Sequence, residues 1–191
     1  MIDKKDLLNP PNIVSLIRVF MAPILLWLAY SQHSTLYIII LCFTIFTDVL
    51  DGFLARYLNM ITELGSHLDS WGDFIIYTTM AVSAWWLWPA IIKEEIIYVT
   101  AIILSFVLPV IIGLMKFHTL TSYHTWSVKL AVFITLISYL MVFLDWQRWP
   151  IYLAAAVSVL AAIEEILITL MMKHEHADVR SVWHALKYAD E

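Results

Sequence analysis

The chain has 191 residues, enough for one ordinary domain. It is 62% hydrophobic and 14% charged, whereas a soluble domain averages about 45–50% apolar and about 25% charged residues. This balance predicts an all-helical integral membrane protein. The net charge of −5 argues against nucleic-acid binding, which requires a basic surface, and the single cysteine, Cys42, excludes a disulfide framework within the chain.

Six segments are apolar over the roughly 20 residues that a membrane-spanning helix needs, so the sequence predicts six transmembrane helices. The linkers between them are short, which favours one domain over residues 1–191. A short interfacial helix is expected in the first dozen residues, with a break at Asn9-Pro10-Pro11 before the first span. The predicted spans are 13–31, about 35–58, about 64–90, about 95–117, about 124–144 and about 150–172.

The basic residues predict how the spans are oriented. If both termini face the cytoplasm, all of the 11 lysines and arginines except Lys93 and Arg148 lie at the cytoplasmic side or in helix ends near it. This agrees with the positive-inside rule, so we expect a multi-pass protein of the cytoplasmic membrane. Tryptophans at the outer ends of the third, fifth and sixth spans predict an aromatic belt there. They are Trp85, Trp86, Trp88, Trp146 and Trp149.

Four aspartates lie where the second predicted span ends and the third begins. Asp48 and Asp51 are three residues apart and Asp69 and Asp73 are four apart, so each pair lies on one face of its helix. The two helices are expected to be antiparallel neighbours, which brings the four carboxylates to one depth near the cytoplasmic end. Four negative charges in a medium of low dielectric repel strongly unless a cation relieves the repulsion.

Ligands that are all oxygen favour a hard divalent cation such as Mg²⁺, Mn²⁺ or Ca²⁺ over zinc. Four carboxylates can hold two such ions about 3.5–4 Å apart, the arrangement used for phosphoryl-type displacement. Gly52, Ala55 and Gly65 near the aspartates permit close helix approach or leave room for a phosphate ligand. Arg56 lies about one turn beyond Asp51 and is a natural partner for a diphosphate.

These positions form the pattern D-x2-D-G-x2-A-R-x8-G-x3-D-x3-D, which is complete from Asp48 to Asp73. The pattern resembles the signature of the CDP-alcohol phosphatidyltransferases, and the six-span layout and length are also similar to that family. The resemblance implies that a phosphatidyl group passes from a CDP-alcohol, usually CDP-diacylglycerol, to a small acceptor alcohol, and that CMP is released. It also implies dependence on Mg²⁺ or Mn²⁺, with two ions expected, and a homodimer in the lipid bilayer.

The resemblance further implies roles for individual residues. Asp48, Asp51 and Asp69 resemble the metal ligands of the family. Asp73 resembles its general base, which takes the proton of the acceptor hydroxyl and also contacts metal. The site for the CDP-alcohol is expected to use Pro11, Asn12, Ile13, Val14, Gly52, Arg56 and Thr62.

The sequence leaves the acceptor alcohol open. Family members that use glycerol 3-phosphate usually carry D-P-x-A-D-K, whereas residues 69–74 here read DSWGDF. The serine in this segment is reminiscent of phosphatidylserine synthases, although Gly72 departs from their pattern. Glycerol 3-phosphate is the first expectation, and an acceptor like that of the phosphatidylserine synthases, or another alcohol, is the alternative. Lys116 and Lys129, at the cytoplasmic ends of the fourth and fifth spans, are expected either to bind the acceptor or to reach the membrane surface.

The roles of several other polar residues stay open. Arg18, a turn or so inside the first span, fits the interior and the surface equally well. Glu164 and Glu165 point about 100° apart on the sixth span, so at most one easily faces a pocket. The His174-Glu175-His176 stretch is expected to be a solvated tail.

Two other classes of protein are alternatives to an enzyme. One is a cation-coupled membrane transporter, and the other is an inactive structural subunit. The transporter predicts ionisable residues near mid-membrane, and the complete motif speaks against an inactive subunit.

Overall fold

The computed structural model describes residues 10–57, 63–118, 125–172, 181 and 183, and the side chains of 17–47, 70–118, 125–172, 181 and 183. Within these residues the chain is all-helical, as predicted. The helices are α2 (Pro10–Tyr30), α3 (Ser34–Tyr57), α4 (Glu63–Leu87), α5 (Pro89–Glu94), α6 (Ile96–Phe117), α7 (Trp126–Phe143) and α8 (Pro150–Met171). Of the interfacial helix expected in the first dozen residues, residues 1–9 lie outside the described residues. Pro10 and Pro11, which were expected in a break, instead begin α2.

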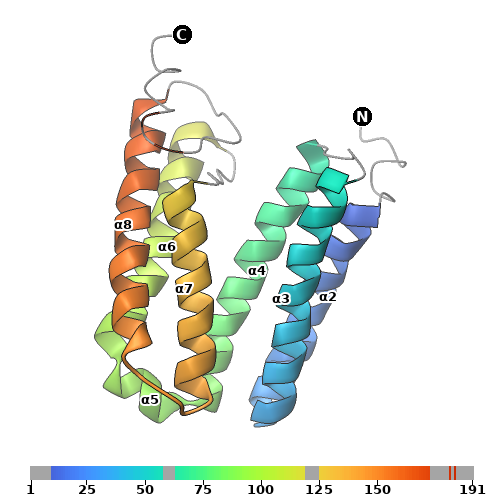
Figure 1. The fold of residues 1–191 in the computed structure, drawn as a ribbon, viewed down its shortest axis with the longest axis vertical. Coiled ribbons are helices and arrows are strands. Elements are labelled where there is room, and N and C mark those ends of the chain that lie inside the picture. The colour runs from blue at the N-terminus through green and yellow to red at the C-terminus, as the bar shows by residue number, and fades with distance from the viewer. Residues whose placement is uncertain (1–9, 58–62, 119–124, 173–180, 182, 184–191) are drawn as a thin grey trace. The chain divides into compact units, whose positions relative to one another are not determined.

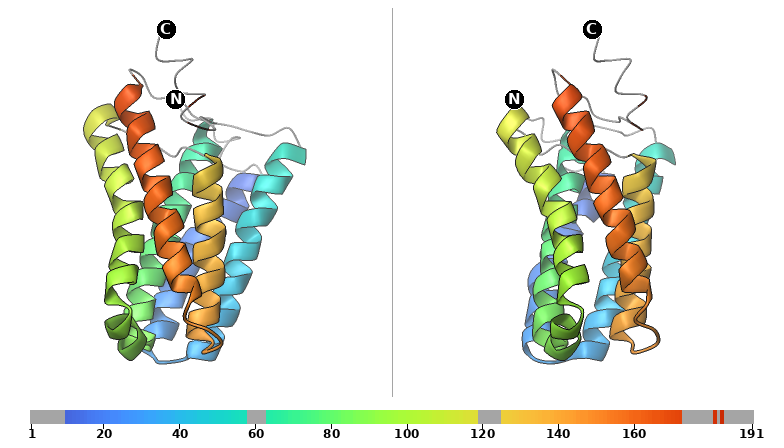
Figure 2. Two further views of the ribbon diagram at one scale, coloured as in Figure 1. Left: turned by 60° about the vertical axis from the view of Figure 1, so that its left-hand side comes forward. Right: turned by 90° about the vertical axis from the view of Figure 1, so that its left-hand side faces the viewer.

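The chain divides into two compact units, Met1–Ala90 and Ile91–Glu191. In the first unit, α2 packs against both α3 and α4, and in the second unit α8 packs against both α6 and α7 (Figure 1). The same neighbours stay together when the view is turned (Figure 2). Consecutive long helices within each unit run in opposite directions, because short connections join them. The prediction of one domain over the whole chain stays a prediction.

The long helices begin and end close to the predicted limits, and the differences have local causes. Helix α2 begins at Pro10 rather than at residue 13, because a proline in the first turn lacks only an N–H that the helix would leave unpaired. Helix α4 ends at Leu87 rather than at 90, because the residue before Pro89 is disfavoured in a helix. Pro89 then begins α5, a separate short helix that the sequence analysis did not resolve.

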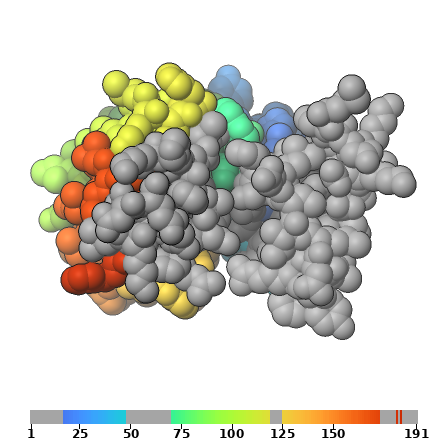
Figure 3. All heavy atoms as spheres, turned by 90° about the horizontal axis from the view of Figure 1, so that it is seen from above, coloured from blue at the N-terminus to red at the C-terminus, as the bar shows by residue number. Residues whose placement is uncertain are grey.

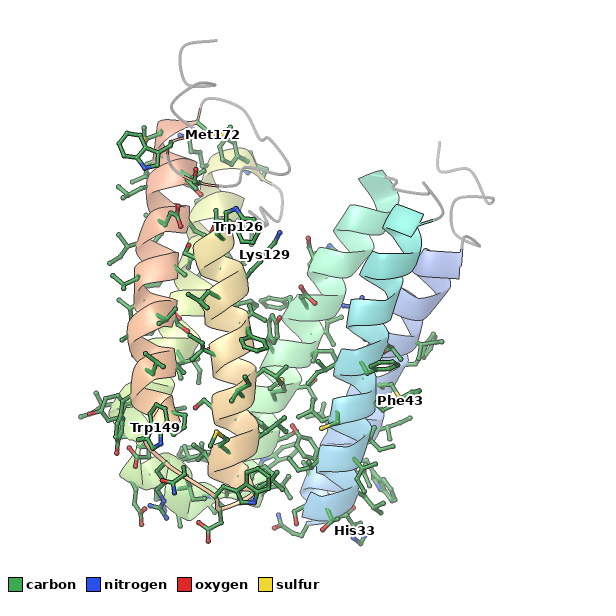
Figure 4. The ribbon with its side chains drawn as sticks, in the orientation of Figure 1. His33, Phe43, Trp126, Lys129, Trp149 and Met172 are labelled. Atoms are coloured by element: carbon green, nitrogen blue, oxygen red, sulfur yellow. The ribbon has the colours of Figure 1, made fainter. Side chains whose placement is uncertain are left out.

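Three helices, α6, α7 and α8, are long and apolar enough to cross a membrane, and two shorter apolar stretches, Ile17–Tyr30 and Ser34–Thr47, lie within α2 and α3. Large apolar side chains such as Phe20, Trp27 and Phe43 are exposed on these helices (Figure 4). Exposed apolar surface on this scale suits lipid rather than water. The chain is therefore a membrane protein with several apolar helices.

Tryptophans mark both ends of the second unit. Trp149, just before α8, lies at one end, and Trp126, at the start of α7, lies at the other (Figure 4). Both indole rings are exposed, as expected of an aromatic belt at each membrane surface. At the Trp149 end, Arg148 donates a hydrogen bond to the Glu94 carboxylate and forms an ion pair with it. The hydrogen bond is the main cause of the raised pKa of the Arg148 guanidinium. Both partners are exposed, so the pair contributes little to stability.

The N-terminus of α7 gives a test of this fold. Thr125 is buried, and its Oγ1 accepts a hydrogen bond from the Val128 N–H at 3.2 Å. We expect Thr125→Ala to lower the free energy of unfolding by about 1 kcal/mol, because an N-cap bond is lost. SDS titration of the detergent-solubilised protein measures the effect. Thr100→Ala, at an exposed position within α6, is the control and should stay within about 0.5 kcal/mol; equal effects of the two variants would contradict the capping role.

Candidate active site

The start of α2, the end of α3 and the start of α4 lie at the same end of the first unit (Figures 1 and 2). Helix bounds therefore give the depth of each aspartate below that end. At 1.5 Å per residue, Asp51 and Asp69 lie about 9 Å from the respective helix ends. Asp48 and Asp73 lie deeper, at about 14 and 15 Å. The backbone thus places the two aspartate pairs at matching depths on α3 and α4.

The residues predicted for the CDP-alcohol, apart from Thr62, lie on helix segments toward the same end. Residues 11–14 fall in the first turns of α2, and Gly52 and Arg56 fall in the last turns of α3. Thr62 lies outside the described residues, and the side chains of the others, like those of Asp48, Asp51 and Asp69, are also outside the description. Their roles as ligands stay predictions. The structure shows only that their backbone positions lie toward the same end of the first unit.

One charged contact at this end is described atom by atom. Arg18 Nη1 on α2 donates a hydrogen bond to Asp73 Oδ1 on α4 at 3.1 Å. The Arg18 side chain is 2% exposed and the Asp73 side chain is 31% exposed. The guanidinium is therefore enclosed, while the carboxylate reaches an accessible edge of the unit. Of the two locations that the sequence left open for Arg18, the structure gives the interior.

Gly72 lies beside this contact. A Cβ atom added at Gly72 would be 3.7 Å from Arg18 Nη1 and 3.8 Å from Arg18 Cζ, which are ordinary van der Waals distances. The small residue allows the backbone of α4 to lie close to the guanidinium. An alanine would also fit, so glycine in place of the alanine of D-P-x-A-D-K leaves the space around Arg18 nearly the same.

Hydroxyl groups just before Asp48 form bonds within their own helix. Thr44 Oγ1 donates to the Ile40 carbonyl at 2.8 Å, and Thr47 Oγ1 donates to the Thr44 carbonyl at 2.6 Å. Both threonines are buried. These bonds satisfy the hydroxyl donors in an apolar interior, where an unpaired polar group is costly. The hydroxyl donors of both threonines are therefore used within α3.

In the second unit, Lys116 contacts the end of a neighbouring helix. Its Nζ donates hydrogen bonds to the carbonyl oxygens of Thr169 and Leu170, both at 2.9 Å. The last carbonyls of a helix lack partners within it, and a cation there also interacts favourably with the helix dipole. Seen end-on, the C-terminal parts of α6 and α8 lie next to each other (Figure 3). The second predicted acceptor lysine, Lys129, is exposed near the start of α7, with its Nζ 5.4 Å from the centre of the Trp126 ring (Figure 4).

Glu164 lies half-buried on α8 and accepts a hydrogen bond from the Ser127 hydroxyl on α7. The Ser127 hydroxyl is in turn 3.0 Å from Thr125 Oγ1. A chain of hydroxyls from the start of α7 thus reaches the carboxylate. The roles of Glu164 and Glu165 were left open by the sequence, and the serine partner of Glu164 was not predicted. The signal that could have found it is the short linker between the fifth and sixth predicted spans, which favours packing of the two helices side by side.

The donor atoms of the aspartate positions fit a divalent metal. Four carboxylates provide only oxygen ligands, which suits Mg²⁺ or Mn²⁺. Among the side chains that the structure describes, no group of three or more His, Cys, Asp or Glu is arranged to hold a metal. Asp73 is the one member of the predicted set within that description, and the His174-Glu175-His176 stretch lies outside it.

The helices and the aspartate positions define a class: a helical membrane protein in which four aspartates of one motif lie toward the same end of a unit of three long helices. Residues 8–171 match the sequence model of the CDP-alcohol phosphatidyltransferase family. The chain belongs to that family, and this confirms the resemblance noted from its motif. No solved structure matches the chain.

Several characterised proteins are similar to part of the chain. A CDP-diacylglycerol–glycerol-3-phosphate 3-phosphatidyltransferase of Aquifex aeolicus is 35% identical over 66 residues, which are 35% of this chain and 37% of that protein. A protein of the same name from Pseudomonas fluorescens is 33% identical over 78 residues, 39% of this chain and 40% of that protein. The human cardiolipin synthase (CMP-forming) is 35% identical over 74 residues, 38% of this chain and 25% of that protein. The chain thus spans less than half the length of these relatives.

The contact of Lys116 with α8 predicts an effect on stability. We expect Lys116→Met to lower the free energy of unfolding by about 0.3–1 kcal/mol, because two terminal carbonyls of α8 lose a charged donor. SDS titration in detergent measures the change. Lys93→Met, at an exposed position of α5, is the matched control and should have a smaller effect. Equal stability of the two variants would show that the Lys116 contact does not stabilise the helix end.

Proposed function

We propose that the chain transfers a phosphatidyl group from CDP-diacylglycerol to an acceptor alcohol and releases CMP. The observation that carries the proposal is the complete aspartate motif, which the backbone brings to matching depths on α3 and α4. Membership of the CDP-alcohol phosphatidyltransferase family supports the same reaction class. Asp48, Asp51, Asp69 and Asp73 would hold Mg²⁺ or Mn²⁺, in two sites. When bound, such ions neutralise the diphosphate and stabilise the leaving phosphate.

The residues of the chain have separate tasks in this reaction. Arg56 and Gly52 on α3, with Thr62 and the start of α2, bind the cytidine diphosphate part of the donor. Asp73 accepts the proton of the acceptor hydroxyl. The acceptor oxygen then forms a bond to the phosphorus that bears the diacylglycerol, and the bond from that phosphorus to the bridging oxygen breaks. CMP leaves with the bridging oxygen, and Arg56 stabilises its charge.

The proposed topology is six membrane-spanning helices, with the site facing the cytoplasm. Three apolar helices of spanning length and two shorter apolar stretches support this arrangement. The distribution of lysines and arginines supports the orientation. The donor lipid then keeps its acyl chains in the bilayer, while its cytidine faces the compartment in which CMP is released. A homodimer is proposed only from the family resemblance.

Glycerol 3-phosphate is the first acceptor that we propose. Two of the relatives described above carry glycerol 3-phosphate in their names as the acceptor. The name of the human cardiolipin synthase (CMP-forming) supports a second candidate, an acceptor alcohol from which cardiolipin is formed. We propose Lys129 and Lys116 as partners of the acceptor phosphate. Lys129 is exposed, and the Lys116 ammonium has three N–H donors, of which the helix carbonyls take two.

The reaction is tested with purified protein, CDP-diacylglycerol, Mn²⁺ or Mg²⁺ and a panel of acceptors that contains glycerol 3-phosphate, serine and phosphatidylglycerol. We expect CMP release that depends on one acceptor and disappears on chelation of the metal. Asp73→Asn should lower the rate about 10²–10⁴-fold, because the proton acceptor is lost. Asp145→Asn, in the loop before α8, is the control and should keep the wild-type rate.

Two outcomes would contradict this function. One is the absence of CMP release with every acceptor, which would favour the transporter hypothesis. The other is a wild-type rate for Asp73→Asn, which would show that Asp73 is not the base.

The acceptor site gives a separate prediction. Lys129→Met should raise the KM for glycerol 3-phosphate about 10-fold or more with little change in kcat, because a charge-assisted hydrogen bond contributes about 1.5–3 kcal/mol. Steady-state rates of CMP release at varied acceptor concentration measure both constants. Lys129→Arg keeps the charge and should stay near the wild-type KM. An unchanged KM for Lys129→Met would remove this residue from the acceptor site.

A further inference from the structure

We propose that Arg18 is a positioning residue for Asp73, and this inference rests on the proposed function. The hydrogen bond from Arg18 Nη1 to Asp73 Oδ1 joins α2 to α4 across 55 residues of sequence. The donor belongs to a helix that carries none of the motif aspartates. By engaging one oxygen of the carboxylate, Arg18 limits rotation of the group that takes the proton.

The burial of the two partners separates this role from substrate binding. A residue that clamps a diphosphate must present its guanidinium to the ligand. The Arg18 side chain is 2% exposed, whereas that of Asp73 is 31% exposed. Gly72 also brings the backbone of α4 against the guanidinium. Arg18 therefore reaches the reaction through Asp73, and Asp73 is the member of the pair that meets substrate.

A purely structural role is a poor explanation for an arginine at this position. Removing an ion pair from water costs several kcal/mol per ion, and well-packed apolar residues of similar volume often stabilise a protein as well or better. Other buried positions on α2, such as Leu25 and Leu28, are apolar. A buried charge on this helix is expected where its partner carboxylate must be held in one geometry.

The positional accuracy that catalysis requires explains why the hydrogen bond from Arg18 to Asp73 matters. A catalytic group has to be kept within about 0.5 Å of its productive position, and neighbouring residues that lock its rotamer supply this accuracy. Partners that orient metal-binding or catalytic side chains typically contribute 10–100-fold to activity or metal affinity. The positive charge of Arg18 also reduces repulsion between Asp73 and the other three aspartates.

The test compares Arg18→Met, Arg18→Lys and Arg148→Met in detergent-purified full-length protein. We expect Arg18→Met to lower kcat about 10–100-fold while the KM for CDP-diacylglycerol changes less than about 3-fold. Arg18→Lys, which keeps a positive charge, should recover a large part of the loss. Arg148→Met removes an exposed ion pair and should keep the wild-type kcat. Mn²⁺ binding, measured by electron paramagnetic resonance, should weaken in Arg18→Met and not in Arg148→Met.

Three results would overturn the positioning role. The first is a kcat for Arg18→Met within about 3-fold of wild type. The second is a loss that appears only in the KM for CDP-diacylglycerol, as expected of a substrate clamp. The third is a fall in the amount of folded Arg18→Met protein that accounts for the whole loss of activity, while the remaining folded protein binds Mn²⁺ like wild type. If the wild-type protein releases no CMP with any acceptor, the proposed function fails instead, and Mn²⁺ binding still tests the contact.

Discussion

Polar groups within apolar helices need partners inside the protein, and this requirement determines much of the described structure. In the first unit, the buried Arg18 guanidinium forms an ion pair with the Asp73 carboxylate. In the second unit, Ser127 supplies a hydroxyl to Glu164, and the two residues come from different helices. In both cases the helix–helix contact and the polar contact depend on each other, because an unpaired charge in an apolar medium costs several kcal/mol.

The sequence predicted the long helices well because each is an apolar run bounded by prolines, charges or short polar loops. Such limits are local, so α3 and α8 begin and end within about two residues of their predicted bounds. The short helix α5 was missed for a physical reason: it has only six residues and contains both Pro89 and Lys93, so it lacks an apolar period of its own. Its neighbours on both sides are apolar, and the prediction placed residues 89–90 in the third span and left 91–94 in the linker before the fourth.

In the site too, local features were predicted from the sequence, whereas contacts between distant segments were not. The spacing of the aspartates predicted that two lie on one face of α3 and two on one face of α4, since residues three or four apart are neighbours on a helix surface. Spacing does not determine the partner of Arg18, because that depends on how α2 is rotated against α4. For the same reason the sequence did not find Ser127 as the partner of Glu164 or the α8 carbonyls as the partners of Lys116. These contacts depend on packing between segments that are distant in the chain.

The departures of residues 69–74 from the glycerol-phosphate pattern lie on two different faces of α4. Gly72 is on the buried face against Arg18, where a methyl group would also fit. Phe74, in place of the lysine of the pattern, is half-buried on another face, and its ring lies 6.2 Å from the exposed ring of Trp71 in an edge-to-face arrangement. The buried face therefore accepts either small residue without a change at Asp73. With Asp73 as the proposed base, the Trp71–Phe74 pair alters the exposed surface beside it, and we expect acceptor choice to depend more on this surface than on Gly72.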